Sequence, residues 1–206
     1  SDASQVNMAN VAGATLNLGA NSDTVGAVDV TNGVISGSGK LSATSFALAD
    51  GSASAALSGN GSLTKSGSGT LTLTGANSYT GTTTVKEGNL IVDGGGISNL
   101  SNIVVGDTAG QVSTLSVSNG AAIYSGPWQV GTVSGASGNS VSIGGSGSPV
   151  VISNAGVFVG TAANANFNTM VVTNASLLSQ GEVNVGHGGN TATGAILTLL
   201  GNVTWD

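Results

Sequence analysis

The chain has 206 residues, of which only 6% are charged; three Lys and no Arg stand against nine acidic residues, giving a net charge of −6. Without clustered basic residues, the composition excludes nucleic-acid binding and attraction to an anionic membrane surface. Cysteine is absent, so neither a disulfide nor a cysteine-based metal site can form. The 35 Gly residues, together with abundant Val, Thr, Ser and Asn, predict short strands joined by turns.

Residues 1–60 contain short apolar segments that alternate with polar residues and are separated by Gly and Ser. Examples are Thr15–Leu18, Val28–Val30 and Phe46–Leu48. Alternation of this kind predicts strands with one buried face, which we assign to early, less regular coils. The longest apolar-rich run of the whole chain, Ala195–Leu200, is far shorter than the ~20 residues that a membrane span needs. No membrane insertion of this chain is therefore expected.

Residues 61–92 combine many motifs at fixed offsets. These motifs are Leu63-Thr-Lys65, Gly69-Thr-Leu-Thr-Leu73, Gly75-Ala-Asn77, Tyr79-Thr-Gly81, Thr83-Thr-Val85 and Gly88-Asn-Leu90. In them the segment closely resembles the passenger-associated transport repeat of bacterial autotransporters, also called the autotransporter-associated β-strand repeat. The resemblance implies a right-handed β-helix that is exported across an outer membrane to the cell surface. It also implies a role for the segment in export and folding of the rod, and it implies no reaction.

The residues of this segment lead to a similar structure without the resemblance. Leu71 and Leu73 alternate with threonines, which predicts that the two leucines point into a core and the threonines point out. Asn77 is expected to begin a turn, and Tyr79 is expected to cover a corner. Residues 82–85 are expected to enter the next strand.

Residues 99–206 contain four units of about 25 residues each, a period typical of solenoid proteins. Each unit contains four consecutive residues of one pattern: an apolar residue, any residue, Val and Gly. The Val-Gly pairs that end this pattern recur at nearly constant spacing and are Val105-Gly106, Val130-Gly131, Val159-Gly160 and Val185-Gly186. A second strand follows each pair, centred on Val117, Ile143, Val172 and Leu199, and a third short apolar segment closes each unit. Because one such unit cannot bury its own apolar face, the units are expected to stack as coils.

The predicted fold is all-β: a single right-handed parallel β-helix over residues 1–206, with about three short strands per turn. The four valines would form one interior column, and each following glycine would open a corner by positive φ or close backbone approach. The variable tracts would be loops, namely Asp107–Gln111, Thr132–Asn139, Thr161–Asn168 and His187–Thr193. At ~25 residues per turn and ~4.8 Å per turn, the rod would have roughly eight turns over roughly 40 Å. A β-sandwich of hairpins, the rival fold, predicts no such columns.

The last residues suggest a partner. Trp205-Asp206 aligns with Trp128-Gln129, the start of a unit, so the chain is expected to end inside a strand. An unpaired edge with little charge invites pairing. We therefore expect either a piece of a longer passenger or end-to-end self-association through the open terminal coil into a filament.

Residues able to carry chemistry are sparse, and we assign no catalytic, cofactor-binding or metal-binding residue. His187 is the one histidine, and a metal site needs three or four ligands. Cleavage of a polysaccharide needs two carboxylates ~5–10 Å apart. In this sequence, only the stacking of successive coils could bring two carboxylates within this distance. Asp93, Asp107 and Glu182 are the candidates. Exposed Trp128 and Tyr124 could bind glycans, although the repeat places Trp128 in the interior.

The sequence thus predicts a secreted or cell-surface structural or adhesive module with no cofactor, not an enzyme. A ligand on a host or matrix surface is the expected partner. Two alternatives stay open. A polysaccharide-active β-helix enzyme would require acids to meet in one groove, and a glycan-binding module would require exposed aromatic rings.

Overall fold

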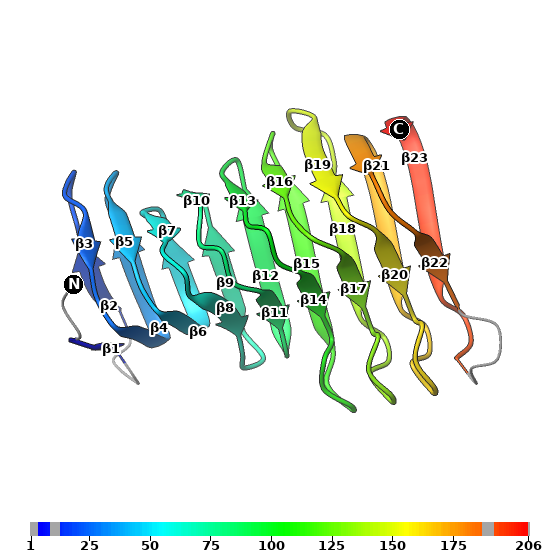
Figure 1. Cartoon of the computed structure of the whole chain (residues 1–206), viewed down its shortest axis with the longest axis horizontal. Coiled ribbons are helices and arrows are strands. Elements are labelled where there is room, and N and C mark those ends of the chain that lie inside the picture. Colours follow the sequence, from blue (N-terminus) through cyan, green and yellow to red (C-terminus); the bar gives the residue numbers. More distant parts are fainter. Residues whose placement is uncertain (1–3, 9–12, 187–191, 206) are drawn as a thin grey trace.

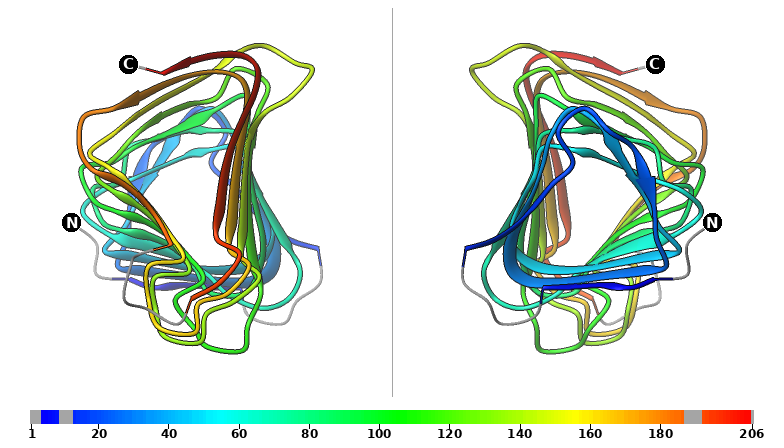
Figure 2. Two further views of the ribbon diagram at one scale, coloured as in Figure 1. Left: turned by 90° about the vertical axis from the view of Figure 1, so that its right-hand side faces the viewer. Right: turned by 90° about the vertical axis from the view of Figure 1, so that its left-hand side faces the viewer.

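The computed structural model describes residues 4–8, 13–186 and 192–205, which coil into a parallel β-helix (Figure 1). Its 23 strands pair in parallel with the strands of neighbouring coils, and the described residues contain no helix. Views along the rod show the coils superimposed around one three-sided interior (Figure 2). The predicted all-β parallel β-helix is therefore confirmed. The part of the chain that is described offers no helix that could cross a membrane.

The strands fall on three faces. The first face contains β1 (Val6–Met8), the first parts of β4 (Ala27–Ser36) and β6 (Ser45–Ala53), β8 (Ser62–Lys65), β11 (Thr83–Val85), β14 (Ile103–Val105), β17 (Trp128–Val130), β20 (Val157–Val159) and β22 (Val183–Val185). The second face contains β2 (Ala14–Asn17), the later parts of β4 and β6, β9 (Thr70–Leu73), β12 (Gly88–Asp93), β15 (Ser113–Ser118), β18 (Ser140–Gly144) and the first parts of β21 (Thr169–Ser179) and β23 (Ile196–Trp205). The third face contains β3 (Asp23–Thr24), β5 (Lys40–Ser42), β7 (Ala56–Ser58), β10 (Ala76–Asn77), β13 (Gly96–Ser98), β16 (Ala122–Tyr124), β19 (Val150–Asn154) and the ends of β21 and β23.

Parallel pairing without offset places equivalent residues above one another. On the first face this produces the valine column, which consists of Val85, Val105, Val130, Val159 and Val185 and is continued toward the N-terminus by Lys65, Leu48, Val30 and Met8. Every second residue of each strand points inward, because side chains alternate between the two faces of a strand. A short strand of apolar, variable and apolar residues therefore buries two side chains and exposes one.

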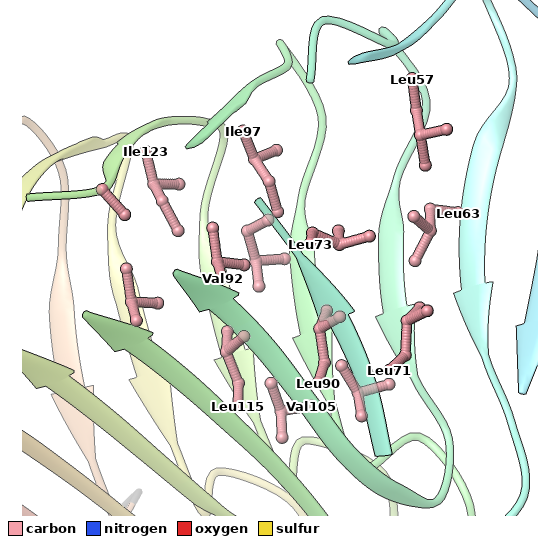
Figure 3. Close-up of a cluster of buried hydrophobic side chains, with 14 of the residues drawn as sticks. Leu57, Leu63, Leu71, Leu73, Leu90, Val92, Ile97, Val105, Leu115 and Ile123 are labelled. Atoms are coloured by element: carbon pink, nitrogen blue, oxygen red, sulfur yellow. The ribbon is translucent and has the colours of Figure 1, made fainter. Parts of the chain in front are cut away.

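The second and third faces follow the same rule. Leu71, Leu90 and Leu115 stack in one column of the second face, and Leu73, Val92 and Val117 stack in the next. Figure 3 shows the leucines, valines and isoleucines of several coils filling the interior together. Almost all are at most 2% exposed, so the core is one continuous apolar stack along the rod. Stability in such a fold sums over neighbouring coils.

The coils differ in length, which corrects the uniform repeat of about 25 residues, although the valine column spans eight turns from Met8 to Val185, in agreement with the estimate of roughly eight. Members of the valine column follow one another more closely in the sequence before Val105 than after it. The short intervals run from Leu48 to Lys65, to Val85 and to Val105, and the long ones run from Val105 to Val130, to Val159 and to Val185. The chain therefore makes more turns than a uniform repeat of the later length allows. The early coils are regular but short, which is why the longer repeat is not visible in them.

The additional residues of the later coils lie at the corner between the first and second faces, at the bottom of Figure 1. These corner loops bond to one another: the N–H of Gly135 donates to the carbonyl of Ala163 (3.1 Å), and that of Gly138 donates to Asn166 (2.8 Å). The Ser137 hydroxyl donates to the carbonyl of Asn164 (2.8 Å). The predicted loops thus continue the stacking of the strands beside them. The loop expected at His187 lies partly outside the described residues.

The end of the chain corrects one alignment. Trp205 pairs with Leu177 on the third face, whereas Trp128 pairs with Ile103 and Val157 on the first face. Trp205 therefore closes a coil and does not begin a new one. A register shift between Thr173 and Ala175 in β21 accompanies this last pairing.

Candidate functional site

The four valines of the predicted repeat lie in one column that faces the interior of the rod, as expected. Val105, Val130 and Val159 are fully buried, and Val185 is partly buried. Each of them pairs with its counterpart in a neighbouring coil. Each strand ends at this valine, and the following glycine turns the chain out of the sheet into the corner loop.

The glycines that follow these valines all have positive φ: +79° at Gly106, +58° at Gly131, +60° at Gly160 and +63° at Gly186. L-residues with side chains rarely adopt this conformation. Space is a second constraint at the first two, because a Cβ there would lie 2.2 Å from the side-chain amide of Asn139 or Asn168 respectively. The two glycines therefore leave room for two asparagines.

Those asparagines form an interior chain of hydrogen bonds, here called the asparagine ladder (Ser113, Asn139 and Asn168). Oδ1 of Asn168 accepts from the backbone N–H and from Nδ2 of Asn139, both at 2.9 Å, and Oδ1 of Asn139 accepts from the N–H of Ser113 at 2.8 Å. Nδ2 of Asn168 donates to the carbonyls of Ala136 (2.9 Å) and Ala165 (2.8 Å). Both asparagines are fully buried. The ladder satisfies backbone groups where the corner loops rejoin the second face.

Residues 63–92 span β8 to β12 in the middle of the rod. Leu71 and Leu73 are 2% and 0% exposed and stack on Leu90 and Val92 of the next coil, inside the core (Figure 3). The segment has neighbours on both sides, since β8 pairs with β6 and β11 pairs with β14. It is therefore an integral part of the stack.

Tyr79 lies inside the corner that it was expected to cover. It is fully buried, its hydroxyl is 2.7 Å from Oγ1 of Thr83, and its ring centroid is 6.0 Å from that of Phe46. Burial raises the pKa of the phenol, and the hydrogen bond to Thr83 partly opposes the shift. Nδ2 of Asn99 also donates to Thr83 Oγ1 (3.3 Å). Asn77 ends β10 and is buried, whereas it was expected to begin a turn.

Lys65 is the unexpected member of the valine column. It pairs with Leu48 on one side and Val85 on the other, and its side chain is fully buried. Its ammonium donates to three carbonyls, those of Ser66 (2.7 Å), Gly67 (2.6 Å) and Glu87 (3.1 Å). Three donors thus meet three acceptors, two on the following corner and one on the next coil.

The charge of Lys65 has limited compensation. Nζ lies 3.9 Å from Oδ1 of Asp50, which is beyond hydrogen-bonding distance. Desolvation lowers the pKa of Lys65, and the negative charges of Asp50 and Glu87 act in the opposite direction. The carbonyl contacts are therefore the main interaction of the ammonium, and they join the corner of one coil to that of the next.

Sequence reasoning overlooked both the lysine and the ladder, although each leaves a signal. Lys65 stands two residues after the inward-facing Leu63, which places its side chain in the interior. Asn139 and Asn168 each immediately precede the strand that forms the second face. Both asparagines fall at the ends of predicted loops, where asparagine is common and draws no notice.

The residues considered for catalysis have separate partners. Oδ1 of Asp93 accepts from Ser118 and Asn119, Asp107 is 3.8 Å from the ammonium of Lys86, and Glu182 accepts from Asn184. Within the described ranges no three acids or histidines gather as a metal site would require. His187 lies outside these ranges.

The two aromatic residues considered for glycan binding differ in exposure. Trp128 is fully buried, and its indole N–H donates to the Ser125 hydroxyl at 2.9 Å, so its ring is not available to a ligand. Tyr124 is 49% exposed. A glycan-binding module requires an exposed aromatic ring, and of these two residues only Tyr124 has one.

Comparison with known families gives a match in the middle of the chain. Residues 63–92 match the family model of the passenger-associated-transport-repeat, which confirms the resemblance seen in that segment. No curated protein and no solved structure matches the chain.

The corner glycines provide the first prediction. Gly131→Ala should lower the free energy of unfolding by about 3 kcal/mol or more, because a methyl group would strain the backbone and collide with the Asn168 amide. Gly110→Ala is the matched control, since Gly110 has φ +77° but nothing lies within 4 Å of the added carbon. It should cost only about 1–2 kcal/mol. If chemical denaturation gave the same loss of unfolding free energy for Gly131→Ala and Gly110→Ala, the predicted collision with the Asn168 amide would be contradicted.

Lys65 provides the second prediction. Lys65→Met keeps a long side chain but leaves three carbonyls without their donor, so we expect a loss of about 2–4 kcal/mol in the free energy of unfolding. Lys86→Met, at a half-exposed lysine paired with Asp107, should cost at most about 1 kcal/mol. Denaturation of the two variants under one condition tests the difference, and similar losses would rule out a structural role for the Lys65 ammonium.

Because the pKa of Lys65 is shifted, the difference in unfolding free energy between wild type and Lys65→Met should depend on pH. Because the pKa is lower in the folded chain than the ordinary 10.5, the unfolded chain binds more protons between the two values. Stability contributed by Lys65 therefore rises with pH through this window, up to 10.5. The stability difference between wild type and Lys65→Met should grow accordingly, whereas Tyr79 titrates equally in both proteins.

Proposed function

We propose that this chain is part of an exported bacterial passenger and serves as a rigid structural or adhesive rod on the cell surface. The position of residues 63–92 supports the proposal most strongly. The strands of this matched repeat pair in register with coils on both sides, β8 with β6 and β12 with β15. The repeat is thus built into the rod that it would help to fold.

The stacking suggests how such a rod could form after export. Each coil contacts only its neighbours, so a folded segment offers its edge as a template for the next coil. The matched repeat contains several buried groups that need polar partners, among them Lys65 and the Tyr79–Thr83 pair. Their hydrogen bonds are satisfied within the repeat, because the Lys65 ammonium bonds to residues 66, 67 and 87. We propose that the repeat specifies the register at which stacking begins.

The outer surface suits contact with a host or matrix surface through neutral groups. One outward column of the second face runs through Thr72, Ile91, Ser116 and Ser142. With 12 charged residues in 206, long-range steering of a charged partner is weak. Recognition would then depend on hydrogen bonds and apolar contacts along the rod.

A polysaccharide-active enzyme is the alternative that this arrangement supports least. Such an enzyme needs paired carboxylates. The three candidate acids instead bond to different neighbours: Asp93 to Ser118, Asp107 to Lys86, and Glu182 to Asn184. We therefore favour a non-catalytic role.

Surface exposure of the parent protein in its native host is the third prediction. Antibodies against residues 1–206 should label intact cells, and external protease should remove the signal without permeabilisation. Labelling only after permeabilisation would contradict export to the surface.

The same assay tests the role of the repeat. Lys65→Met should reduce the amount of labelled protein more than Val130→Ala, which removes packing from the same column outside the repeat. Val130→Ala should cost about 2–4 kcal/mol, similar to Lys65→Met. Equal surface amounts in the two variants would mean that only overall stability matters.

A further inference from the structure

The third face carries a hollow of about 270 Å³ where β10, β13 and β16 lie side by side in the upper part of Figure 1. It opens on the outside of the rod, away from the corner loops and from the interior of the coils. The residues that line it are Ala76, Asn77, Ser78, Gly95, Gly96, Ile97, Ser98, Ala122 and Tyr124. It combines residues of the matched repeat with residues of the next two coils.

The hollow has a simple origin in the register. Ala76, Gly96 and Ala122 form one outward column, and the middle coil has no side chain there. A Cβ on Gly96 would lie 2.3 Å from the carbonyl oxygen of Ala122, so the backbones approach closely at this point. Tyr124 stands in the neighbouring outward column beside Ser98, and its 49% exposed ring forms a wall.

The floor of the hollow is rigid. Nδ2 of Asn77 donates to the carbonyls of Gly75 (2.8 Å) and Gly96 (2.9 Å), and Oδ1 accepts from the N–H of Leu57 (3.0 Å). Ile97 fixes the floor from below, because its side chain is 1% exposed in the core. A preformed site of this kind loses little conformational entropy when a ligand binds.

The lining determines which ligands fit. It contains no charged residue, so it offers no ion pair to a phosphate, a carboxylate or an amine. Its polar side chains at the rim are the hydroxyls of Ser78, Ser98 and Tyr124, all on exposed residues, and among the described residues none of the three makes a side-chain hydrogen bond. Its walls are the Tyr124 ring and the methyl groups of Ala76 and Ala122.

The hollow is smaller than the roughly 300–1,000 Å³ of sites for drug-sized ligands, which limits it to one or two small rings. A neutral sugar has the matching chemistry, with an apolar ring face to lie against an aromatic ring and hydroxyls along its edge. We propose that this hollow, the Tyr124 site, binds a single neutral sugar unit of a glycan. The ring of Tyr124 supplies the stacking face, and Ser78 and Ser98 supply hydrogen bonds.

Saturation-transfer difference NMR on the whole chain tests this proposal. The probes are methyl glycosides of neutral hexoses and of N-acetylhexosamine at up to roughly 50 mM, a range that detects weak binding. At least one neutral glycoside should receive saturation. A uronic acid of the same ring size should bind at least about threefold more weakly, because the site offers its carboxylate no cation.

Variants locate the binding. Tyr124→Ala should weaken binding about tenfold or more, and Tyr124→Phe should keep it within about threefold because stacking is retained. Phe167→Ala is the matched control, since Phe167 is a 67% exposed aromatic residue outside the hollow, and it should have no effect. Circular dichroism verifies that each variant is folded.

Two results would overturn the proposal. One is the absence of saturation transfer to any neutral glycoside. The other is unchanged binding in folded Tyr124→Ala. Displacement of bound glycoside by a short peptide with Leu or Phe side chains, at lower peptide than sugar concentration, would instead assign the site to an apolar protein segment.

Discussion

Stacking of successive coils in register is the constraint on which the rest of this structure depends. Parallel strands without offset place each interior residue on its counterpart, so Val105, Val130 and Val159 form a column in which each side chain packs on those of the neighbouring coils. The backbone groups of each strand find their partners in the coils above and below. A coil can lengthen only where the chain leaves the sheet, which explains why additional residues gather at the corners.

Polar groups inside the rod follow from the same constraint. Lys65 occupies a valine position, and the asparagine ladder lies where the corner loops rejoin the sheet. The Lys65 ammonium and the side-chain amides of Asn139 and Asn168 bond chiefly to backbone carbonyl or N–H groups, so burial does not leave them unsatisfied. The contacts that cross between coils also fix the register, because a shifted coil would separate the Lys65 ammonium from the Glu87 carbonyl and Asn139 from Asn168. Polar residues thus add specificity to a stack in which many apolar residues are interchangeable.

Much of this architecture could be predicted from the sequence. Residues that stack in one column are of similar type, so the same residue type recurs in the sequence once per coil. The Val-Gly pairs at 105–106 and 130–131 reveal the coils, and the alternation around Leu71 and Leu73 reveals the inner face. The coils before Val105 were not recognised as members of the later repeat, because they are shorter than the coils after it. The last coil was misaligned because two tryptophans suggested an equivalence that the pairing does not have.

The sites were harder to predict for a physical reason. A buried lysine or asparagine is indistinguishable in sequence from an exposed one until its column is known. The Tyr124 site depends on neighbours that are distant in the sequence, which only stacking brings together. Trp128 shows the converse, because its position in the column indicated burial before the structure did, and it is fully buried.

Cross-linking of neighbouring coils tests the register most directly, since the chain has no cysteine of its own. Ser116 and Ser142 pair directly on the outer surface of the second face, and adjacent parallel strands lie ~4.8 Å apart, within the Cα range of a disulfide. Cysteines at 116 and 142 should form an intramolecular disulfide under mild oxidation. Cysteines at 116 and 140, offset by two residues along the strand, should stay reduced because their Cα atoms are about 8 Å apart. Efficient oxidation of the second pair, or failure of the first, would contradict stacking in register.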